Sequence, residues 1–317
     1  MLVVQKPDIN MLVKRAELFA QLRSFFLQRQ VLEVDAPLIS AATVTDIHIE
    51  SIPVSVERLG KVAENYLITS PEFYMKQLLA AGSPSIYYLG KVFRQGEHGS
   101  RHHHEFTMLE WYRLAWDEHQ LIDEVRDLLT MFLPGMPVTK ITYGELFFSV
   151  LGINPHQASL DDLRGCVQRH VEMNVSTLSL SDCVDVLFSH CIEPTLQGIT
   201  FVYNYPASQA ALAKMTADQQ GAAVARRFEV FIDGMELGNG YCELTDINEQ
   251  RNRFDQDIKI RQQQHKKIYP VDQSLLSALE VGLPECAGVA IGIDRLLMKI
   301  LKKSEIQQVI PVLDRNL

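Results

Sequence analysis

The fold is decided by residues 86–114, which read IYYLGKVFRQGEHGSRHHHEFTMLEWYRL. Two runs rich in aromatic and aliphatic residues, 86–93 and 106–114, flank a polar segment that contains glycine. This pattern is typical of two long antiparallel strands joined by a surface loop, where functional side chains often lie. The stretch therefore predicts a hairpin whose loop takes part in function.

Elements on both sides of this hairpin follow from the spacing of apolar residues. Helices are expected at 8–29, 73–81, 246–264, 273–280 and 294–302. Strands are expected at 31–36, which ends before Pro37, and at 47–56, 66–69, 201–205, 228–232, 235–244 and 288–293. The Asp233-Gly234 pair between two of these strands is a typical hairpin turn.

The order of these elements favours an α+β fold with a mostly antiparallel sheet flanked by helices. Strands seldom alternate with single helices here, as they would in a doubly wound parallel sheet. The region from about 118 to 199 is mainly helical and is expected to be an insertion. No repeat or low-complexity linker interrupts the chain, so residues 1–317 are expected to form one domain.

Composition excludes several classes of protein. Hydrophobic residues make up 47% of the chain and charged residues 22%, which is typical of a globular protein and not of a disordered or collagen-like one. The formal net charge of -9 offers no overall positive field for a polyphosphate backbone, so a nucleic-acid partner is disfavoured.

The compartment is expected to be the cytoplasm. The five cysteines form no CxxC pair and cannot all pair with one another, which favours a reducing environment. The N-terminal segment contains Pro7, Asp8 and Asn10 where a signal peptide needs an unbroken apolar run, and no stretch is long and apolar enough for a membrane span.

Charged residues lie inside several predicted strands. Arg94 ends the first strand of the hairpin, and Glu110 lies within the second. Glu229, Glu236 and Glu243 lie within or beside the strands at 228–232 and 235–244. A single strand carboxylate often faces solvent, but the set together favours a polar cleft, whose charges need cations such as Mg²⁺ on phosphates or a basic substrate.

Glu236 and Glu243 are seven residues apart, so an ideal strand would place them on opposite faces. A kink at Gly238-Asn239-Gly240 is expected to bring both onto one site. The same glycines do not form a dinucleotide motif, and the chain has no P-loop.

These strings resemble, in family order, the motifs of the class II aminoacyl-tRNA synthetases of the lysyl branch. Residues 93–94 with 105–112 resemble motif 2, and residues 288–295 resemble motif 3. The first helix and the strand before Pro37 resemble motif 1, and residues 236–244 resemble the lysine-pocket segment.

The resemblance narrows to the ligases that attach lysine to elongation factor P. Fewer than ten residues precede the first predicted helix, so an anticodon-binding domain is not expected there and neither is a tRNA partner. Ala290 stands where the lysyl-tRNA synthetases typically have glycine and these ligases have alanine. The expected substrates are ATP and (R)-β-lysine or lysine, the expected acceptor is elongation factor P, and motif 1 implies a homodimer.

The resemblance also implies roles for individual residues in ATP binding. Arg94 would bind the α-phosphate and Arg295 the γ-phosphate, and both are expected to be catalytic. Phe106 would stack on adenine, and Gly292 would leave room for the nucleotide. The list of expected ATP contacts is completed by Glu236 and Leu237, and Glu229 and Glu236 are expected to hold Mg²⁺.

For the amino acid, the resemblance implies a pocket with an acidic end. Glu243 would pair with the substrate side-chain ammonium and act as the main selector. The remaining expected pocket residues are Ser70, Pro71, Glu72, Tyr112, Asn239 and Ala290.

The chain departs from the usual ligase pattern in the motif 2 loop. Gly96 replaces a carboxylate and His103 replaces an asparagine, so the ATP contacts of this loop stay open. Two alternatives therefore remain: a class II ligase with another acceptor, and a catalytically inactive paralogue that acts as a binding or regulatory subunit. The basic residues near the end of the 246–264 helix, Arg261 among them, are expected to form a solvated face.

Overall fold

The computed structural model describes residues 8–311, and the chain forms two compact units. The first comprises Met1–Leu114, Thr245–Pro284 and Ala290–Leu317. The second comprises Ala115–Leu244 and Glu285–Val289. Strand β12 (Cys286–Gly292) begins in the second unit and ends in the first.

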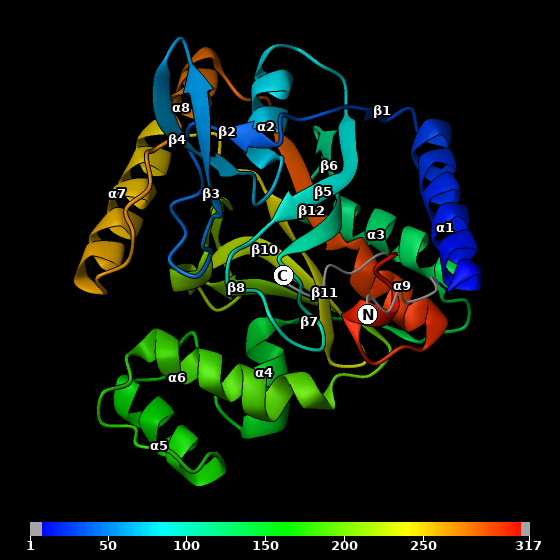
Figure 1. The fold of residues 1–317 in the computed structure, drawn as a ribbon. Coiled ribbons are helices and arrows are strands. Elements are labelled where there is room, and N and C mark those ends of the chain that lie inside the picture. Colours follow the sequence, from blue (N-terminus) through cyan, green and yellow to red (C-terminus); the bar gives the residue numbers. More distant parts are fainter. Residues whose placement is uncertain (1–7, 312–317) are drawn as a thin grey trace, which may run out of the picture. The chain divides into compact units, whose positions relative to one another are not determined.

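The first unit contains the predicted hairpin. β5 (Ile86–Phe93) and β6 (Glu105–Leu114) pair antiparallel along their whole length (Figure 1). β1 (Leu32–Glu33) joins the outer edge of β5 in parallel. A separate small antiparallel sheet has the order β2 (Ile39–Ser40), β4 (Lys61–Leu67), β3 (Pro53–Arg58).

The helices of the first unit are α1 (Ile9–Gln28), α2 (Glu72–Ala80), α7 (Ile247–Gln263), α8 (Gln273–Val281), α9 (Ile293–Leu301) and the 3₁₀ turn η4 (Ile306–Gln308). α1 begins after Asp8, whose side chain accepts a hydrogen bond from the Met11 amide, as a helix N-cap should. Its Phe26 ring stacks on Tyr87 of β5 at 4.4 Å and meets Trp111 of β6 edge-on at 5.2 Å. These aromatic contacts fix the helix against the hairpin.

The second unit contains a sheet of order β11 (Met235–Cys242), β10 (Ala223–Ile232), β8 (Ile199–Pro206), β7 (Val138–Thr142), with β9 (Met215–Ala217) paired to β10. All of these pairs are antiparallel except β7 with β8. The β10–β11 hairpin turns at Asp233 and Gly234, which both have positive φ. This is the turn that the Asp-Gly pair predicts.

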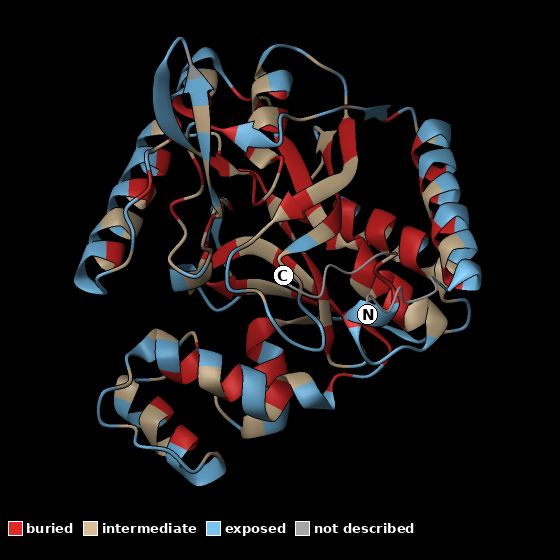
Figure 2. Ribbon diagram, in the orientation of Figure 1, coloured by how far each residue is buried: buried red, intermediate tan, exposed pale blue. Residues whose placement is uncertain are grey.

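The helices of the second unit are α3 (Glu118–Phe132), α4 (Tyr143–Leu151), α5 (Leu160–His170), α6 (Leu180–Leu187), the π-helical turn η1 (Phe188–Ile192), and the 3₁₀ turns η2 (Glu193–Thr195) and η3 (Ala207–Gln209). α3 to α6 each begin with a capping box. Figure 2 shows α4 to α6 buried on one side and exposed on the other. Their buried faces share an apolar core in which Tyr143 stacks on Phe147 and Phe188.

The predicted α+β fold with a mostly antiparallel sheet and flanking helices is confirmed, and the differences are local. The strand expected at 31–36 is only two residues long. The strand expected at 47–56 begins only at Pro53, and in the segment before it the carbonyls of Asp46 and Ile49 accept hydrogen bonds from Arg261. The short strands β7 and β9 were not predicted.

None of the helices within residues 8–311 combines the length and the apolar run that crossing a bilayer requires. The five cysteines are free thiols, and only Cys191 among them is partly exposed.

Candidate active site

The β5–β6 hairpin brings together two of the residues expected to bind ATP. Arg94 directly follows β5, and its amide donates to the His104 carbonyl at 2.9 Å. His104 Nδ1 lies 3.1 Å from the Arg94 carbonyl, so the main chain is held on both sides of this residue pair. The Arg94 guanidinium lies 5.3 Å from the centre of the Phe106 ring. A guanidinium, which suits a phosphate, and a flat apolar ring therefore lie side by side.

Arg295, in the first turn of α9, contacts the loop of the same hairpin. Its Nε donates to the Arg101 carbonyl at 3.2 Å, and its Nη2 lies 2.6 Å from His102 Nε2. Since a guanidinium can only donate, His102 Nε2 is the acceptor in this contact. The loop thus connects the two predicted catalytic arginines. Of the neighbouring predicted residues, Gly292 is the N-cap of α9 and Ala290 lies in β12.

Two of the predicted amino-acid pocket residues of the first unit, Ser70 and Tyr112, contact Glu110. Ser70 Oγ donates to Glu110 Oε2 at 2.7 Å, and the Tyr112 hydroxyl donates to Oε1 at 2.7 Å. Ser70 Oγ also accepts the Glu72 amide at 3.0 Å, and Pro71 caps α2. The sequence indicated Glu110 as a charged residue within a strand but assigned it no role. In the structure, every residue from 107 to 112 is buried, so Glu110 is a charged side chain inside a buried strand. A glutamate within such an apolar run is the feature that could have indicated a role.

A second buried charge near this group was missed. Lys76, one turn into α2, is 2% exposed, and its ammonium lies 2.6 Å from Glu72 Oε1. A buried lysine thus forms an ion pair with a predicted substrate residue. A lysine four positions after a glutamate on a helix is so common that the sequence offers no signal for burial.

The acidic residues of the second unit form a chain of hydrogen bonds around Arg227. Arg227 Nη2 contacts the Glu229 carboxylate and donates to Asn239 Oδ1 at 2.7 Å. Asn239 Nδ2 in turn donates to Glu236 Oε1 at 2.5 Å. The Arg227 guanidinium also lies 4.8 Å from the centre of the buried Tyr205 ring. The predicted metal pair, Glu229 and Glu236, thus belongs to one network, whose central arginine the sequence did not reveal.

An irregularity in the β10–β11 pairing aligns these side chains. Val230 pairs with Gly238 but Phe231 pairs with Glu236, so Leu237 is an extra residue in β11. One extra residue reverses the alternation of side chains and lets Glu236 share a face with Asn239. The kink expected at Gly238-Asn239-Gly240 therefore exists one residue earlier, at Leu237.

Electrostatics in this network favour a bound cation. The pKa of Glu229 is raised to about 7: burial is the largest cause, Arg227 lowers the pKa, and the Glu236 carboxylate raises it. Two carboxylates that repel each other in a buried place gain from any added positive charge. Among the described residues, no group of three or more His, Cys, Asp or Glu side chains is arranged to hold a metal ion, so other ligands would have to complete a metal site here.

Glu243, the predicted selector, lies one residue beyond the end of β11 and is 1% exposed. Its amide donates to the Cys286 carbonyl at 3.0 Å, and it forms a bridge with Ala213. A carboxylate so deeply buried is costly without a positive partner or hydrogen bonds. Leu237, the extra residue of β11, is buried as well, with 2% of its surface exposed.

The structure thus forms two groups of predicted site residues. The first unit holds Arg94, Phe106 and Arg295 around the hairpin loop, and Ser70 and Tyr112 around Glu110, with Glu72 bonded to Ser70. The second unit holds Glu229, Glu236 and Asn239 around Arg227, with Glu243 beyond the strand end. Basic and aromatic groups suited to a nucleotide are found in the first set, and carboxylates suited to a cation in the second.

A family model described as tRNA synthetases class II (D, K and N) matches residues 2–312 of the chain. The chain is 45% identical over 316 residues to a Vibrio parahaemolyticus protein, with 95% of each chain covered. It is 46% identical over 317 residues to a Vibrio cholerae protein, covering 95% of this chain and 94% of that one. It is 42% identical over 308 residues to a Haemophilus ducreyi protein, covering 95% and 93%. Each of these relatives is named "Elongation factor P--(R)-beta-lysine ligase".

Proposed function

The chain belongs to the class II tRNA synthetases of the D, K and N group and, within them, to the elongation factor P (R)-β-lysine ligases, and from this membership we propose that it is an ATP-dependent ligase that joins (R)-β-lysine to a lysine of elongation factor P. The observation that carries this proposal is identity above 40% along nearly the whole chain with relatives of that name. The buried, charged groups described above support it.

The reaction needs no nucleophile from the protein. A carboxylate oxygen of the amino acid attacks the α-phosphorus of ATP, and the bond to pyrophosphate breaks. The acceptor amine then attacks the carbonyl carbon of the adenylate, an amide forms, AMP leaves and one proton is released. The protein contributes orientation and charge neutralisation.

ATP binding is assigned to the hairpin group. Arg94 binds the α-phosphate, where negative charge builds up during attack, and Arg295 binds the γ-phosphate. Phe106 stacks on the adenine ring, and its position beside the Arg94 guanidinium supports this assignment. Gly292 and Leu237 complete the nucleotide contacts.

Mg²⁺ is assigned to Glu229 and Glu236. Carboxylate oxygens are the ligands that Mg²⁺ prefers, and it commonly uses one or two of them together with substrate phosphates and water. The hydrogen-bonded network and the raised pKa of Glu229 fit a site that gains from a cation. When bound, the ion would neutralise phosphate charge, while Arg227 and Asn239 orient the two carboxylates.

The amino acid is assigned to Glu243 and to the group around Glu110. Glu243 pairs with the substrate side-chain ammonium, with Tyr112 and Asn239 as neighbouring contacts. Ser70, Pro71 and Glu72 contact the other amino group. Ala290 adds a methyl group that adjusts the pocket to the position of that amino group.

The acceptor and the assembly are part of the same proposal. Elongation factor P is the protein partner, tRNA is not a substrate, and the reaction takes place in the cytoplasm where this translation factor works. A homodimer is supported by exposed apolar side chains along α1 and the strands that follow it: Ile9, Val13, Leu27, Leu32, Leu38 and Ile39. Light scattering of the purified protein tests the dimer.

A mass measurement tests the function. The protein is incubated with ATP, Mg²⁺, (R)-β-lysine and purified elongation factor P, and the factor is weighed. We expect a gain of one lysine residue, and no gain with an elongation factor P that lacks its acceptor lysine or with an Arg94→Ala enzyme. Pyrophosphate exchange without a mass gain would favour another acceptor, and the absence of exchange with every lysine isomer would favour an inactive paralogue.

A further inference from the structure

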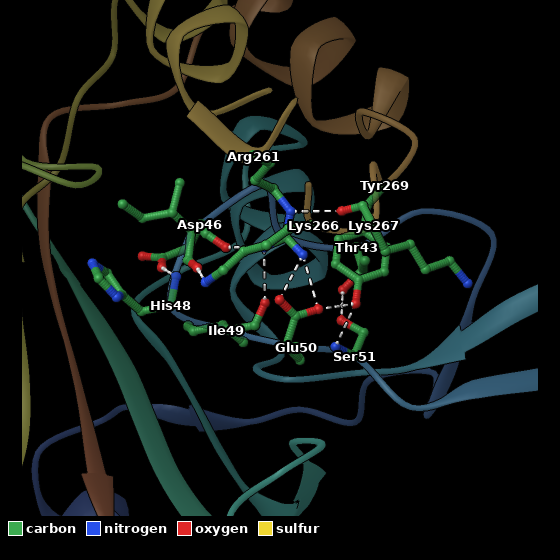
Figure 3. Close-up of polar contacts among 11 residues, drawn as sticks. Thr43, Asp46, His48, Ile49, Glu50, Ser51, Arg261, Lys266, Lys267 and Tyr269 are labelled. Carbon is green, nitrogen blue, oxygen red and sulfur yellow. Dashed lines mark hydrogen bonds and ion pairs between the residues drawn. The ribbon is translucent and has the colours of Figure 1, made fainter. Parts of the chain in front are cut away.

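Arg261, in the last turn of α7, is completely buried although it is charged. Its guanidinium extends from the helix toward the segment that precedes β3 (Figure 3). Nε donates to the Lys267 carbonyl at 2.7 Å, and Nη1 donates to the Asp46 carbonyl at 2.7 Å. Nη2 donates to both carboxylate oxygens of Glu50, each at 2.8 Å. The expectation that this arginine belongs to a solvated face is therefore wrong.

Glu50 is held from a second direction by Tyr269. The Tyr269 hydroxyl donates to Glu50 Oε2 at 2.7 Å and accepts the Ser51 amide at 3.1 Å. The Arg261 guanidinium lies 4.6 Å from the centre of the Tyr269 ring. A forked, charged pair with a third donor fixes the side chain and the main chain of Glu50 far better than a single contact would.

The main chain of Glu50 connects this cluster to the predicted ATP site. Its carbonyl accepts the Gln95 amide at 2.8 Å, and the two residues form an isolated antiparallel bridge. Gln95 directly follows Arg94, whose own amide is bonded to the His104 carbonyl at 2.9 Å. The start of the hairpin loop is thus held by His104 on one side and by Glu50 on the other.

We propose that Arg261 is a positioning residue for amino-acid activation, which orients the Arg94 guanidinium through Glu50 and Gln95. This inference rests on the proposed function, in which Arg94 binds the α-phosphate. A buried ion pair is weak evidence for a purely stabilising role, because apolar residues of similar size often replace such a pair without loss of stability. Here the pair instead holds Glu50, whose carbonyl accepts the amide of Gln95, the residue after the proposed phosphate ligand Arg94.

Three variants test the proposal at increasing severity. Tyr269→Phe removes one donor to Glu50, Glu50→Gln removes its charge, and Arg261→Lys keeps the charge but loses the fork. In ATP–pyrophosphate exchange we expect kcat of Arg261→Lys to fall by about 10- to 100-fold, as displacement of a reacting group by about 1 Å does. The KM for (R)-β-lysine should stay within about twofold, because the fork does not reach the amino-acid pocket.

Hydrogen exchange at the Gln95 amide provides a second measurement that does not depend on activity. Loss of the fork should free the Glu50 carbonyl, and we expect this amide to exchange at least about tenfold faster in Arg261→Lys. Tyr269→Phe should give a smaller increase in the same peptide.

Two controls separate positioning from loss of stability. Lys14→Met removes an exposed ion pair with Glu17 on α1, a helix that contributes no residue to the Arg261 cluster. It should leave exchange and kcat unchanged. Leu163→Ala opens a cavity in the fully buried core of α5 and lowers the melting temperature without touching the cluster.

The proposal is overturned if the Gln95 amide of Arg261→Lys exchanges at the wild-type rate. It is also overturned if the three variants lose no more activity than Leu163→Ala does at an equal loss of melting temperature, and if the KM for ATP and the KM for (R)-β-lysine change by the same factor. If the wild-type protein activates no lysine isomer, the proposed function fails, while the exchange rate at Gln95 still decides whether Arg261 positions the loop.

Discussion

The guanidinium of Arg15 and the carboxylate of Asp294 lie 2.6 Å apart, although 279 residues separate them in the chain. Both residues are buried, and both also contact Thr107. Arg15 Nη2 donates to the Thr107 hydroxyl at 2.6 Å, and the Thr107 amide donates to Asp294 Oδ2 at 2.6 Å. Thr107 follows Phe106, and Asp294 precedes Arg295. The first helix therefore holds the residues next to two proposed ATP contacts.

Arg15→Met should leave the Asp294 carboxylate buried without its cation. We expect the free energy of unfolding to fall by about 3–5 kcal/mol, measured by urea denaturation. The matched control is Arg23→Met, which removes an exposed pair with Glu33 and should change the free energy of unfolding by at most about 1 kcal/mol. Adding Asp294→Asn to Arg15→Met should restore much of the loss, and equal losses in the two single variants would contradict this account.

Local signals explain why much of the fold could be predicted. The Asp233-Gly234 turn, the spacing of apolar residues along α1, and the runs of aromatic and aliphatic residues in β5 and β6 depend on residues close together in the chain. The short edge strands β7 and β9 depend on partners elsewhere, so no local pattern indicated them.

The candidate site shows the same limit. Arg226 and Arg227 are neighbouring residues of the same type, so the sequence alone does not distinguish them, but they point to opposite sides of β10. Arg226 pairs with Glu118 of α3, whereas Arg227 lies between Glu229 and Asn239. Only the strand register decides which of the two joins the acidic network.

Gly240 is required by the ring of Phe228. A Cβ atom at position 240 would lie 2.3 Å from two atoms of that ring, which is too close for any side chain. We expect Gly240→Ala to lower the free energy of unfolding by about 1–3 kcal/mol, since overpacking forces neighbours to move. Phe228→Leu should recover part of the loss in the double variant, which denaturation of all three proteins measures. Additive losses would contradict a direct clash.

Cys242, beside Glu243, should react slowly with alkylating agents. Burial raises the pKa of its thiol from 9.0 to about 11, so at pH 8 its thiolate fraction falls by about a hundredfold. Iodoacetamide labelling followed by peptide mass spectrometry should therefore modify the half-buried Cys191 first.

The pH dependence of this labelling has a defined sign. Since pH 8 and pH 9 both lie below the pKa of Cys242, its thiolate fraction and labelling rate should rise by about tenfold over that interval. In urea, Cys242 should lose its protection. Rapid labelling of Cys242 in the folded protein would show that this end of β11 opens readily.

Glu110→Gln should weaken binding of the amino acid more than binding of ATP. Each Glu110 oxygen accepts one hydroxyl, from Ser70 or from Tyr112, and an amide offers only one acceptor oxygen. Hydrogen bonds to a charged group contribute about 1.5–3 kcal/mol, so we expect the KM for (R)-β-lysine to rise by about 10- to 100-fold. Tyr112→Phe removes one of the two bonds and should give a smaller rise, and a change confined to the KM for ATP would contradict the assignment.

Glu243→Gln tests the proposed selector directly. The variant keeps the size of the side chain but removes the charge that pairs with the substrate ammonium. A site built around such a pair should lose about 10⁴-fold in kcat/KM when one charge is absent, whereas the KM for ATP should stay near the wild-type value. ATP–pyrophosphate exchange with (R)-β-lysine measures both quantities. The control is Glu105→Gln, which removes only an exposed pair with Lys91 and should leave both unchanged. Wild-type activity in Glu243→Gln would mean that the substrate ammonium is recognised elsewhere, with Glu110 as the next carboxylate to test.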